Sequence, residues 1–101
     1  MTVNEKENIK KNIADAIKVN SEVKKIILFG SFLHSDFPND LDIAIFENSA
    51  EDYITLAIKY RRQLRGVVKK TPLDIIPLKD VYNNFFVQGI NNGEVIYEKG
   101  N

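Results

Sequence analysis

Residues 28–46 read LFGSFLHSDFPNDLDIAIF, and the order of apolar and polar residues in this stretch decides the fold. The short isoleucine-rich run Lys25–Phe29 predicts a strand that ends at Gly30-Ser31. The next run, Leu41–Phe46, is apolar at both alternating sets of positions, which is typical of a central strand covered on both faces. The intervening Phe32–Asn39 has room for one short helical turn.

Helical and strand patterns alternate along the rest of the chain. Apolar residues at helical spacing predict amphipathic helices, and short apolar runs predict strands. The predicted helices are about 4–19, a short turn within 32–39, 53–64 and 78–90, and the predicted strands are 25–29, 41–46, 72–76 and 94–97. This alternation predicts one domain over residues 1–101, of the α/β (α+β) class, with helices flanking a small mixed sheet of about four strands.

The helix that follows the second predicted strand has local signals at both ends. Asn48-Ser49 offers capping oxygens, and Gly66 is a plausible C-terminal stop. Tyr53 and Tyr60 share one helical stripe, which predicts that both rings belong to the core. Further along, Pro77 predicts the end of the third strand.

Composition limits the classes of function that need consideration. The 101 residues are 44% apolar and carry 14 basic and 14 acidic side chains, which is a globular composition with zero formal net charge. Zero net charge argues against direct binding of nucleic acid or of a membrane surface. Cysteine is absent, so disulfides and thiolate metal sites are excluded. With no membrane-length apolar run and no signal-peptide pattern, we expect a cytoplasmic protein that does not associate with membranes.

Two aspartates, Asp40 and Asp42, open the second strand. Residues two apart on an extended segment project from the same face, so the two carboxylates lie near each other and repel. A divalent cation relieves this repulsion, and hard oxygen ligands suit Mg²⁺ or Mn²⁺. The alternative is that an Asp-x-Asp pair merely opens a strand at a solvated edge.

A third aspartate, Asp74, lies inside the otherwise apolar run 72–76. Burying an ionised carboxylate in such a strand is costly unless a cation or hydrogen-bond donors compensate it. If this strand neighbours the strand of Asp40 and Asp42, all three carboxylates can converge on one or two ions. In the alternative, Asp74 faces water at a sheet edge or pairs with a nearby lysine. The lysines in question are Lys69, Lys70 and Lys79.

The pair Gly30-Ser31 sits where the first strand gives way to the predicted helical turn. Glycine lets a ligand approach the backbone closely, and a serine hydroxyl with the amides of a helix start can cradle phosphate oxygens. Alone this pair is an ordinary turn. Combined with the three aspartates it indicates a site for phosphoryl transfer.

Together, Leu28-Phe29-Gly30-Ser31 and the following Asp40-Leu41-Asp42 resemble the signature of the minimal nucleotidyltransferases, the small members of the DNA polymerase beta-like superfamily. The N-terminal helix, the later Asp74 and the closing segment 89–98 match that family in order, so the resemblance spans nearly the whole chain. It implies the polymerase-beta-like nucleotidyltransferase fold.

The resemblance also implies an activity and a site. The activity is transfer of a nucleoside monophosphate, AMP from ATP, to an acceptor hydroxyl with Mg²⁺ or Mn²⁺ as cofactor. Asp40 and Asp42 would match the metal-binding pair. Asp74 would match the third carboxylate, which helps to hold the second ion and draws the proton from the acceptor. Gly30 and Ser31 would hold the triphosphate.

The resemblance further implies a partner. Many short family members act as antitoxins of a small all-helical protein of the HEPN type, and some adenylylate a tyrosine of that partner. Two other interpretations remain: a non-catalytic antitoxin-like subunit that neutralises a helical partner by complex formation, and a fold relative with no site. In one departure from the family, the segment Phe32–Ser35 that follows Ser31 contains no arginine.

Overall fold

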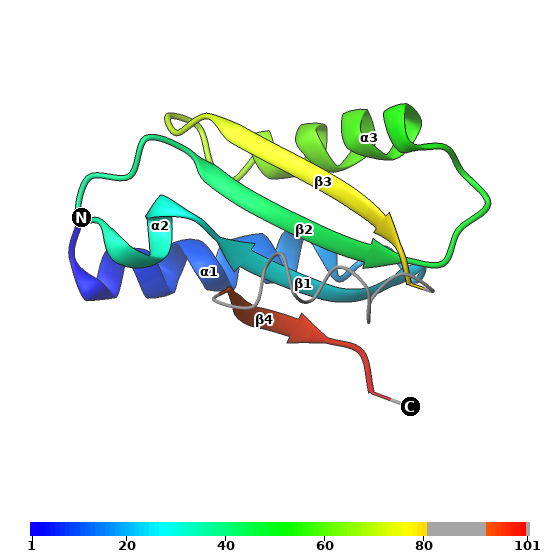
Figure 1. The fold of residues 1–101 in the computed structure, drawn as a ribbon, viewed down its shortest axis with the longest axis horizontal. Helices are drawn as coiled ribbons and strands as arrows, with labels where there is room; N and C mark the ends of the chain where they lie inside the picture. Colours follow the sequence, from blue (N-terminus) through cyan, green and yellow to red (C-terminus); the bar gives the residue numbers. More distant parts are fainter. Residues whose placement is uncertain (81–92, 101) are drawn as a thin grey trace.

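The fold is described by a computed structural model that covers residues 1–80 and 93–100 (Figure 1). The elements, in chain order, are α1 (Val3–Ile17), β1 (Val23–Phe29), α2 (Ser31–His34), β2 (Leu41–Glu47), α3 (Tyr53–Arg65), β3 (Leu73–Lys79) and β4 (Glu94–Glu98). The predicted alternation of helices and strands is confirmed over this part of the chain.

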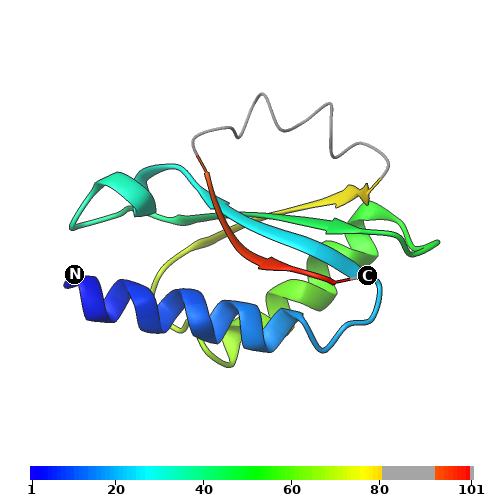
Figure 2. The same cartoon turned by 90° about the horizontal axis from the view of Figure 1, so that it is seen from below.

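The strands form one four-stranded sheet in the order β3-β2-β1-β4 (Figure 1). β1 is antiparallel to both β2 and β4, whereas β2 and β3 are parallel. Figure 2 shows that α1 and α3 lie on the same side of this sheet. The predicted class, a small mixed sheet of the α+β type, is therefore confirmed.

The core explains why β2 is the most apolar strand of the chain. Leu41, Ile43 and Ile45 belong to the main cluster, which packs the sheet against α1 and α3. Ala44 and Phe46, which alternate with them, lie in a second cluster on the other face with Ile27 of β1. Both faces of β2 are buried, as the sequence predicts, and Asp42 is the half-buried exception.

The third strand is longer than predicted. Pro77 does not end it, because β3 continues through that residue to Lys79. β3 is an edge strand, and proline is tolerated there because its missing N–H is needed only where a neighbouring strand would accept it. The helix predicted for 78–90 is therefore wrong at its first two positions, and residues 81–90 lie outside the described part of the chain.

The start of α3 also differs from the prediction. Asp52, not Asn48-Ser49, caps the helix, and its Oδ1 accepts a hydrogen bond of 2.8 Å from the Thr55 amide. Tyr60 is fully buried as predicted, but Tyr53 is 53% exposed, so its assignment to the core is wrong. Tyr53 is the first residue of the helix, and the buried part of its stripe begins only at Leu56.

A partly buried polar contact ties Glu22, the residue before β1, to α3. The Tyr60 hydroxyl donates to Glu22 Oε2 at 2.8 Å, and Lys59 Nζ donates to the same oxygen at 3.0 Å. Burial raises the pKa of Glu22, but hydrogen bonds from Lys59, the Glu22 backbone and Tyr60 outweigh this effect and hold the pKa below its ordinary value. The contact therefore stabilises the fold with Glu22 ionised.

Glu22→Ala is expected to lower the free energy of unfolding by about 1 to 3 kcal/mol, because it leaves the buried Tyr60 hydroxyl without an acceptor. The additional stability that ionised Glu22 gives the wild type is fully present above the pKa of glutamate in the unfolded chain, about 4.3. It is lost as the pH falls through the lower pKa of Glu22 in the folded protein. Urea unfolding of wild type and Glu22→Ala at pH 7 and pH 3 measures the loss of stability and its dependence on pH. Asp15→Ala breaks only an exposed ion pair with Lys18 and is the control. Equal stability of the two variants at pH 7 would contradict this assignment.

Among residues 1–80 and 93–100, no helix is both long enough and apolar enough to cross a membrane.

Candidate active site

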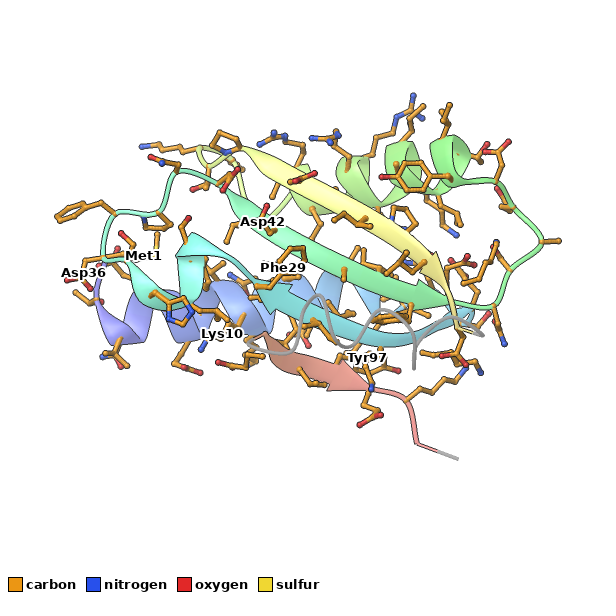
Figure 3. All side chains as sticks on the ribbon, viewed as in Figure 1. Met1, Lys10, Phe29, Asp36, Asp42 and Tyr97 are labelled. Atoms are coloured by element: carbon orange, nitrogen blue, oxygen red, sulfur yellow. The ribbon has the colours of Figure 1, made fainter. Side chains whose placement is uncertain are left out.

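Gly30 makes the turn between β1 and α2, and only glycine fits there. Its φ of 80° and ψ of −156° fall in a backbone region that is essentially restricted to glycine. A Cβ atom at this position would collide with Asp42 Oδ2. Phe29, the residue before it, is the register partner of Asp42, and Figure 3 shows these two residues on adjacent strands. The glycine therefore allows a carboxylate to lie directly against the backbone of the turn.

Asp42 and Asp74 are brought side by side by the parallel pairing of β2 and β3. They are register partners, and partners in neighbouring strands project from the same face of a sheet. That face is opposite α1 and α3, because Leu41 and Ile43, which flank Asp42, both point into the main core. The predicted neighbourhood of these two aspartates is thus observed.

Asp74 is not buried, so the alternative in which it faces water at a sheet edge is the one observed. Its side chain is exposed, because β3 is the edge strand and the polar position of the run faces away from the main core. The desolvation cost of a buried carboxylate therefore does not arise at Asp74. It applies to Asp42 on the central strand, which is half-buried, and Asp40 lies just before β2 and is also half-buried.

The three aspartates act on one another electrostatically. Burial raises the pKa of Asp42, and the negative charges of Asp40 and Asp74 and a hydrogen bond with Asp74 raise it further. Each cause disfavours the ionised form of Asp42. A divalent cation at this position would reverse the balance, because its charge offsets the repulsion and its coordination replaces lost hydration. The donor set, carboxylate oxygens only, fits Mg²⁺ or Mn²⁺.

Over the part of the chain that the structure describes, no three acidic or histidine side chains are already gathered into a complete metal site. Convergence of Asp40, Asp42 and Asp74 on a shared ion therefore stays a prediction. Mg²⁺ usually takes only one or two protein carboxylates and completes its octahedron with waters and substrate phosphates. The adjacent Asp42 and Asp74 fit this mode of binding.

Ser31, the first residue of α2 and the neighbour of Gly30, supplies an unused polar atom at this turn. Its Oγ is buried and has no hydrogen-bond partner among residues 1–80 and 93–100. The α2 turn is closed by the Leu33 amide on the Gly30 carbonyl at 3.2 Å and by the Ser35 amide on the Ser31 carbonyl at 2.8 Å. A buried hydroxyl that is left free is costly, and a phosphate oxygen would satisfy it.

One contact at this turn is not foreseen from the sequence. Lys6, from α1, donates from Nζ to the Ser35 carbonyl at 2.7 Å and lies 5.4 Å from the centre of the Phe32 ring. Lysines fill the polar face of α1, so no local signal distinguishes Lys6 from its neighbours. Only the packing of α1 beneath the turn reveals the contact. His34 of the same turn is exposed.

A cavity of about 250 Å³ lies at the other end of β2 and β3. Its charged centre is Glu47, which is 1% exposed and pairs with Lys79 Nζ at 2.8 Å and with the Ser49 amide at 2.6 Å. Lys79 also donates to the carbonyls of Ser49 and Glu51. Because both oxygens of Glu47 and all three donors of Lys79 are used, this pair holds the β2–α3 connection in place.

Comparison with solved structures supports the fold. The crystal structure of a candidate nucleotidyltransferase from Sulfolobus solfataricus superposes with a TM-score of 0.64, covering 96% of this chain and 83% of that chain at 12% identity. At this identity the likeness concerns the fold. The comparison with curated proteins finds no matching relative.

Comparison with protein families gives a direct match. The family described as polymerase beta nucleotidyltransferase matches residues 11–101, which include every element from the end of α1 onward. The match includes the Gly30-Ser31 turn and all three aspartates. The chain therefore belongs to the polymerase beta nucleotidyltransferase family, as a minimal nucleotidyltransferase.

Proposed function

We propose that the protein transfers a nucleoside monophosphate, AMP from ATP, to an acceptor hydroxyl in a reaction that depends on Mg²⁺ or Mn²⁺. The observation that carries this proposal is the register pairing of Asp42 with Asp74 against the glycine-only turn at Gly30. A carboxylate whose pKa is raised by burial and by two neighbouring aspartates, next to a turn that carries a free hydroxyl, is suited to bind a cation and a polyphosphate together.

Each residue has a role in this proposal. Asp40 and Asp42 hold the metal ions, with Asp74 as a further ligand, and the ions when bound offset the charge of the phosphates during an in-line displacement. Gly30 and Ser31 hold the triphosphate: the glycine leaves room at the turn, and the serine hydroxyl donates to a phosphate oxygen.

Asp74 takes the proton of the acceptor. In the transfer, the acceptor oxygen forms a bond to the α-phosphorus and the bond from that phosphorus to the bridging oxygen breaks. Pyrophosphate leaves, and the acceptor's proton passes to the Asp74 carboxylate. The exposure of Asp74 on the edge strand supports this role, because an acceptor held by another molecule can reach it.

Asp74→Asn is expected to reduce transfer of labelled AMP from [α-³²P]ATP by about 100-fold or more, because it removes a proton acceptor and a metal ligand. ATP binding in the presence of Mg²⁺ should weaken far less, since Asp42 and the Gly30-Ser31 turn remain. The acceptor in this assay is a small helical protein of the HEPN type, which this proposal takes as the substrate. Asp36→Asn alters an exposed aspartate of the α2–β2 connection and should leave transfer unchanged. Equal transfer by Asp74→Asn and wild type would remove Asp74 from the mechanism.

A second function is favoured by an exposed apolar surface on α3. Ile54 and Ile58, one turn apart on the face of the helix that turns away from the sheet, are 69% and 48% exposed, and Tyr53 at the start of the helix is 53% exposed. A cluster of this kind is typical of a protein-binding surface. It supports an antitoxin-like subunit that neutralises a small all-helical partner by complex formation, without catalysis.

The two functions are separated by one variant. A chain with Asp40, Asp42 and Asp74 all changed to asparagine keeps the α3 surface and lacks the carboxylates. If this variant still protects cells from the partner as well as wild type does, complex formation is the function. If protection and labelling of the partner are lost together while the two proteins still co-purify, catalysis is the function.

A further inference from the structure

Lys6 joins α1 to the turn that the proposed function assigns to the triphosphate. Its Nζ donates to the Ser35 carbonyl at 2.7 Å, although the two residues are 29 positions apart in the sequence. The same ammonium group lies 5.4 Å from the centre of the Phe32 ring. Phe32 is fully buried and directly follows Ser31, and Ser35 ends the helical turn that Ser31 begins. Lys6 therefore contacts α2 at Phe32 and at Ser35, the residue that caps its C-terminal end.

The positive charge of Lys6 is not neutralised by the described residues. No carboxylate among residues 1–80 and 93–100 lies within salt-bridge distance of its Nζ. Lys10, one turn later on α1, is different, because it pairs with Glu7 and with Glu94 at 3.0 Å each. Of these two partly buried lysines on one helix, only Lys6 keeps a free charge, and it does so beside α2.

The turn itself lacks such a charge. The segment from Gly30 to Ser35 contains neither lysine nor arginine, and its histidine, His34, is exposed. A triphosphate bound at Gly30-Ser31 would bring several negative charges to a site that already holds three aspartates. A fixed, partly buried cation acts on such charges through a medium that screens less than bulk water does.

We propose that Lys6 is a positioning residue for the triphosphate: it fixes the Gly30-Ser31 turn through Ser35 and Phe32 and supplies the positive charge that this turn lacks. The proposal rests on the proposed function, since it takes the turn to be the triphosphate site. It assigns a specific consequence to one lysine of α1, namely that affinity for ATP with Mg²⁺ depends on Lys6 and not on Lys10.

Three variants test this. Lys6→Met keeps an unbranched stem against Phe32 and removes the charge and the donor, whereas Lys6→Arg keeps both. Lys10→Met is the matched control, because it removes a partly buried lysine from the same helix without touching α2. Calorimetric titration with ATP and Mg²⁺ gives the dissociation constant. Hydrogen exchange of the Leu33 and Ser35 amides, which close the α2 turn, reports on its order without nucleotide.

We expect Lys6→Met to raise the dissociation constant about five- to tenfold at low salt, with a smaller ratio at high salt because the lost interaction is electrostatic. It should also speed exchange of the Leu33 and Ser35 amides. Lys6→Arg should recover most of the affinity, and Lys10→Met should change neither quantity. A merely structural role of Lys6 would lower affinity without the dependence on salt.

The inference is overturned if Lys6→Met binds ATP as tightly as wild type does, or if Lys10→Met weakens binding equally. Either result leaves the proposed function standing, because the wild type still binds. If the wild type itself binds no ATP with Mg²⁺, the proposed function fails, and the charge assigned to Lys6 fails with it. Unchanged exchange of the two amides in Lys6→Met would separately overturn its role in fixing the turn.

Discussion

Asp42→Asn is expected to abolish nucleotidyl transfer and, at the same time, to make the metal-free protein more stable. Transfer should fall by about 1,000-fold or more, because Asp42 is the central carboxylate between Asp40 and Asp74 and its loss removes a metal ligand that no neighbour replaces. The readout is transfer of label from [α-³²P]ATP, with Asp36→Asn as a control that changes an aspartate away from the site.

The gain in stability follows from the sign of the pKa shift. Burial, then Asp40 and Asp74, raises the pKa of Asp42 in the folded protein above the value of about 3.9 in the unfolded chain. The folded state therefore binds the proton more tightly, and the wild type loses stability as the pH rises from the unfolded to the folded pKa. Asparagine does not ionise, so the variant avoids this loss at neutral pH.

Thermal unfolding at pH 7 measures this effect. In EDTA, the Asp42→Asn variant should melt about 2 to 5 °C above wild type, and the difference should shrink toward pH 3, where the wild-type carboxyl is protonated. With Mg²⁺ and ATP, the wild type should gain stability and the variant should not. A variant that melts below wild type in EDTA at pH 7 would contradict the electrostatic description of the site.

Gly30→Ala has the second largest expected effect. The backbone at Gly30 is in a region that other residues scarcely occupy, and the new Cβ would collide with Asp42 Oδ2. The cost to the free energy of unfolding should be about 1 to 3 kcal/mol, and the displaced Asp42 should remove ATP binding in the presence of Mg²⁺. Urea unfolding and calorimetry measure the two effects, with far-UV circular dichroism to show that the variant folds.

Gly66→Ala is the matched control for this change. Gly66 has a φ of −68°, and a Cβ there would lie 3.5 Å from the Gln63 carbonyl oxygen, an ordinary contact. Alanine at this position should leave stability unchanged or raise it slightly, and should leave binding intact. If the two alanine variants behaved alike, the close approach of Asp42 to the turn would not be a requirement of this fold.

The parts of the fold that the sequence predicts are those in which local pattern and packing agree. The run Leu41–Phe46 is apolar on both sides, and both sides are buried, so its central position is readable before the structure is known. Gly30 marks the end of β1 for an equally local reason, because its backbone conformation admits no other residue.

The errors arise where neighbours in space decide the outcome. Pro77 looks like a strand end, but β3 is an edge strand and accepts it. The apolar neighbours of Asp74 in the sequence suggest a buried strand. Those neighbours face the main core, whereas the Asp74 side chain lies on the other face of the edge strand and is exposed. Periodicity along the chain cannot say which strand is outermost.

The residues of the proposed site were named from the sequence, but their arrangement was not. That Asp42 and Asp74 are register partners depends on parallel pairing of β2 with β3, which no local signal fixes. Lys6 could not be singled out, because its contact with Ser35 depends on where α1 packs against the turn. The sequence of the Gly30–Ser35 segment contains no signal that a lysine of α1 contacts it.

The central claim is that Asp42 and Asp74, with Asp40, hold divalent ions beside the Gly30-Ser31 turn. Anomalous scattering from crystals soaked with Mn²⁺ and a non-hydrolysable ATP analogue tests it most directly. We predict manganese density within about 2.2 Å of carboxylate oxygens of Asp42 and Asp74, with phosphate oxygens of the analogue against Ser31 Oγ. Ordered nucleotide elsewhere on the protein, with no manganese at these aspartates, would contradict the account.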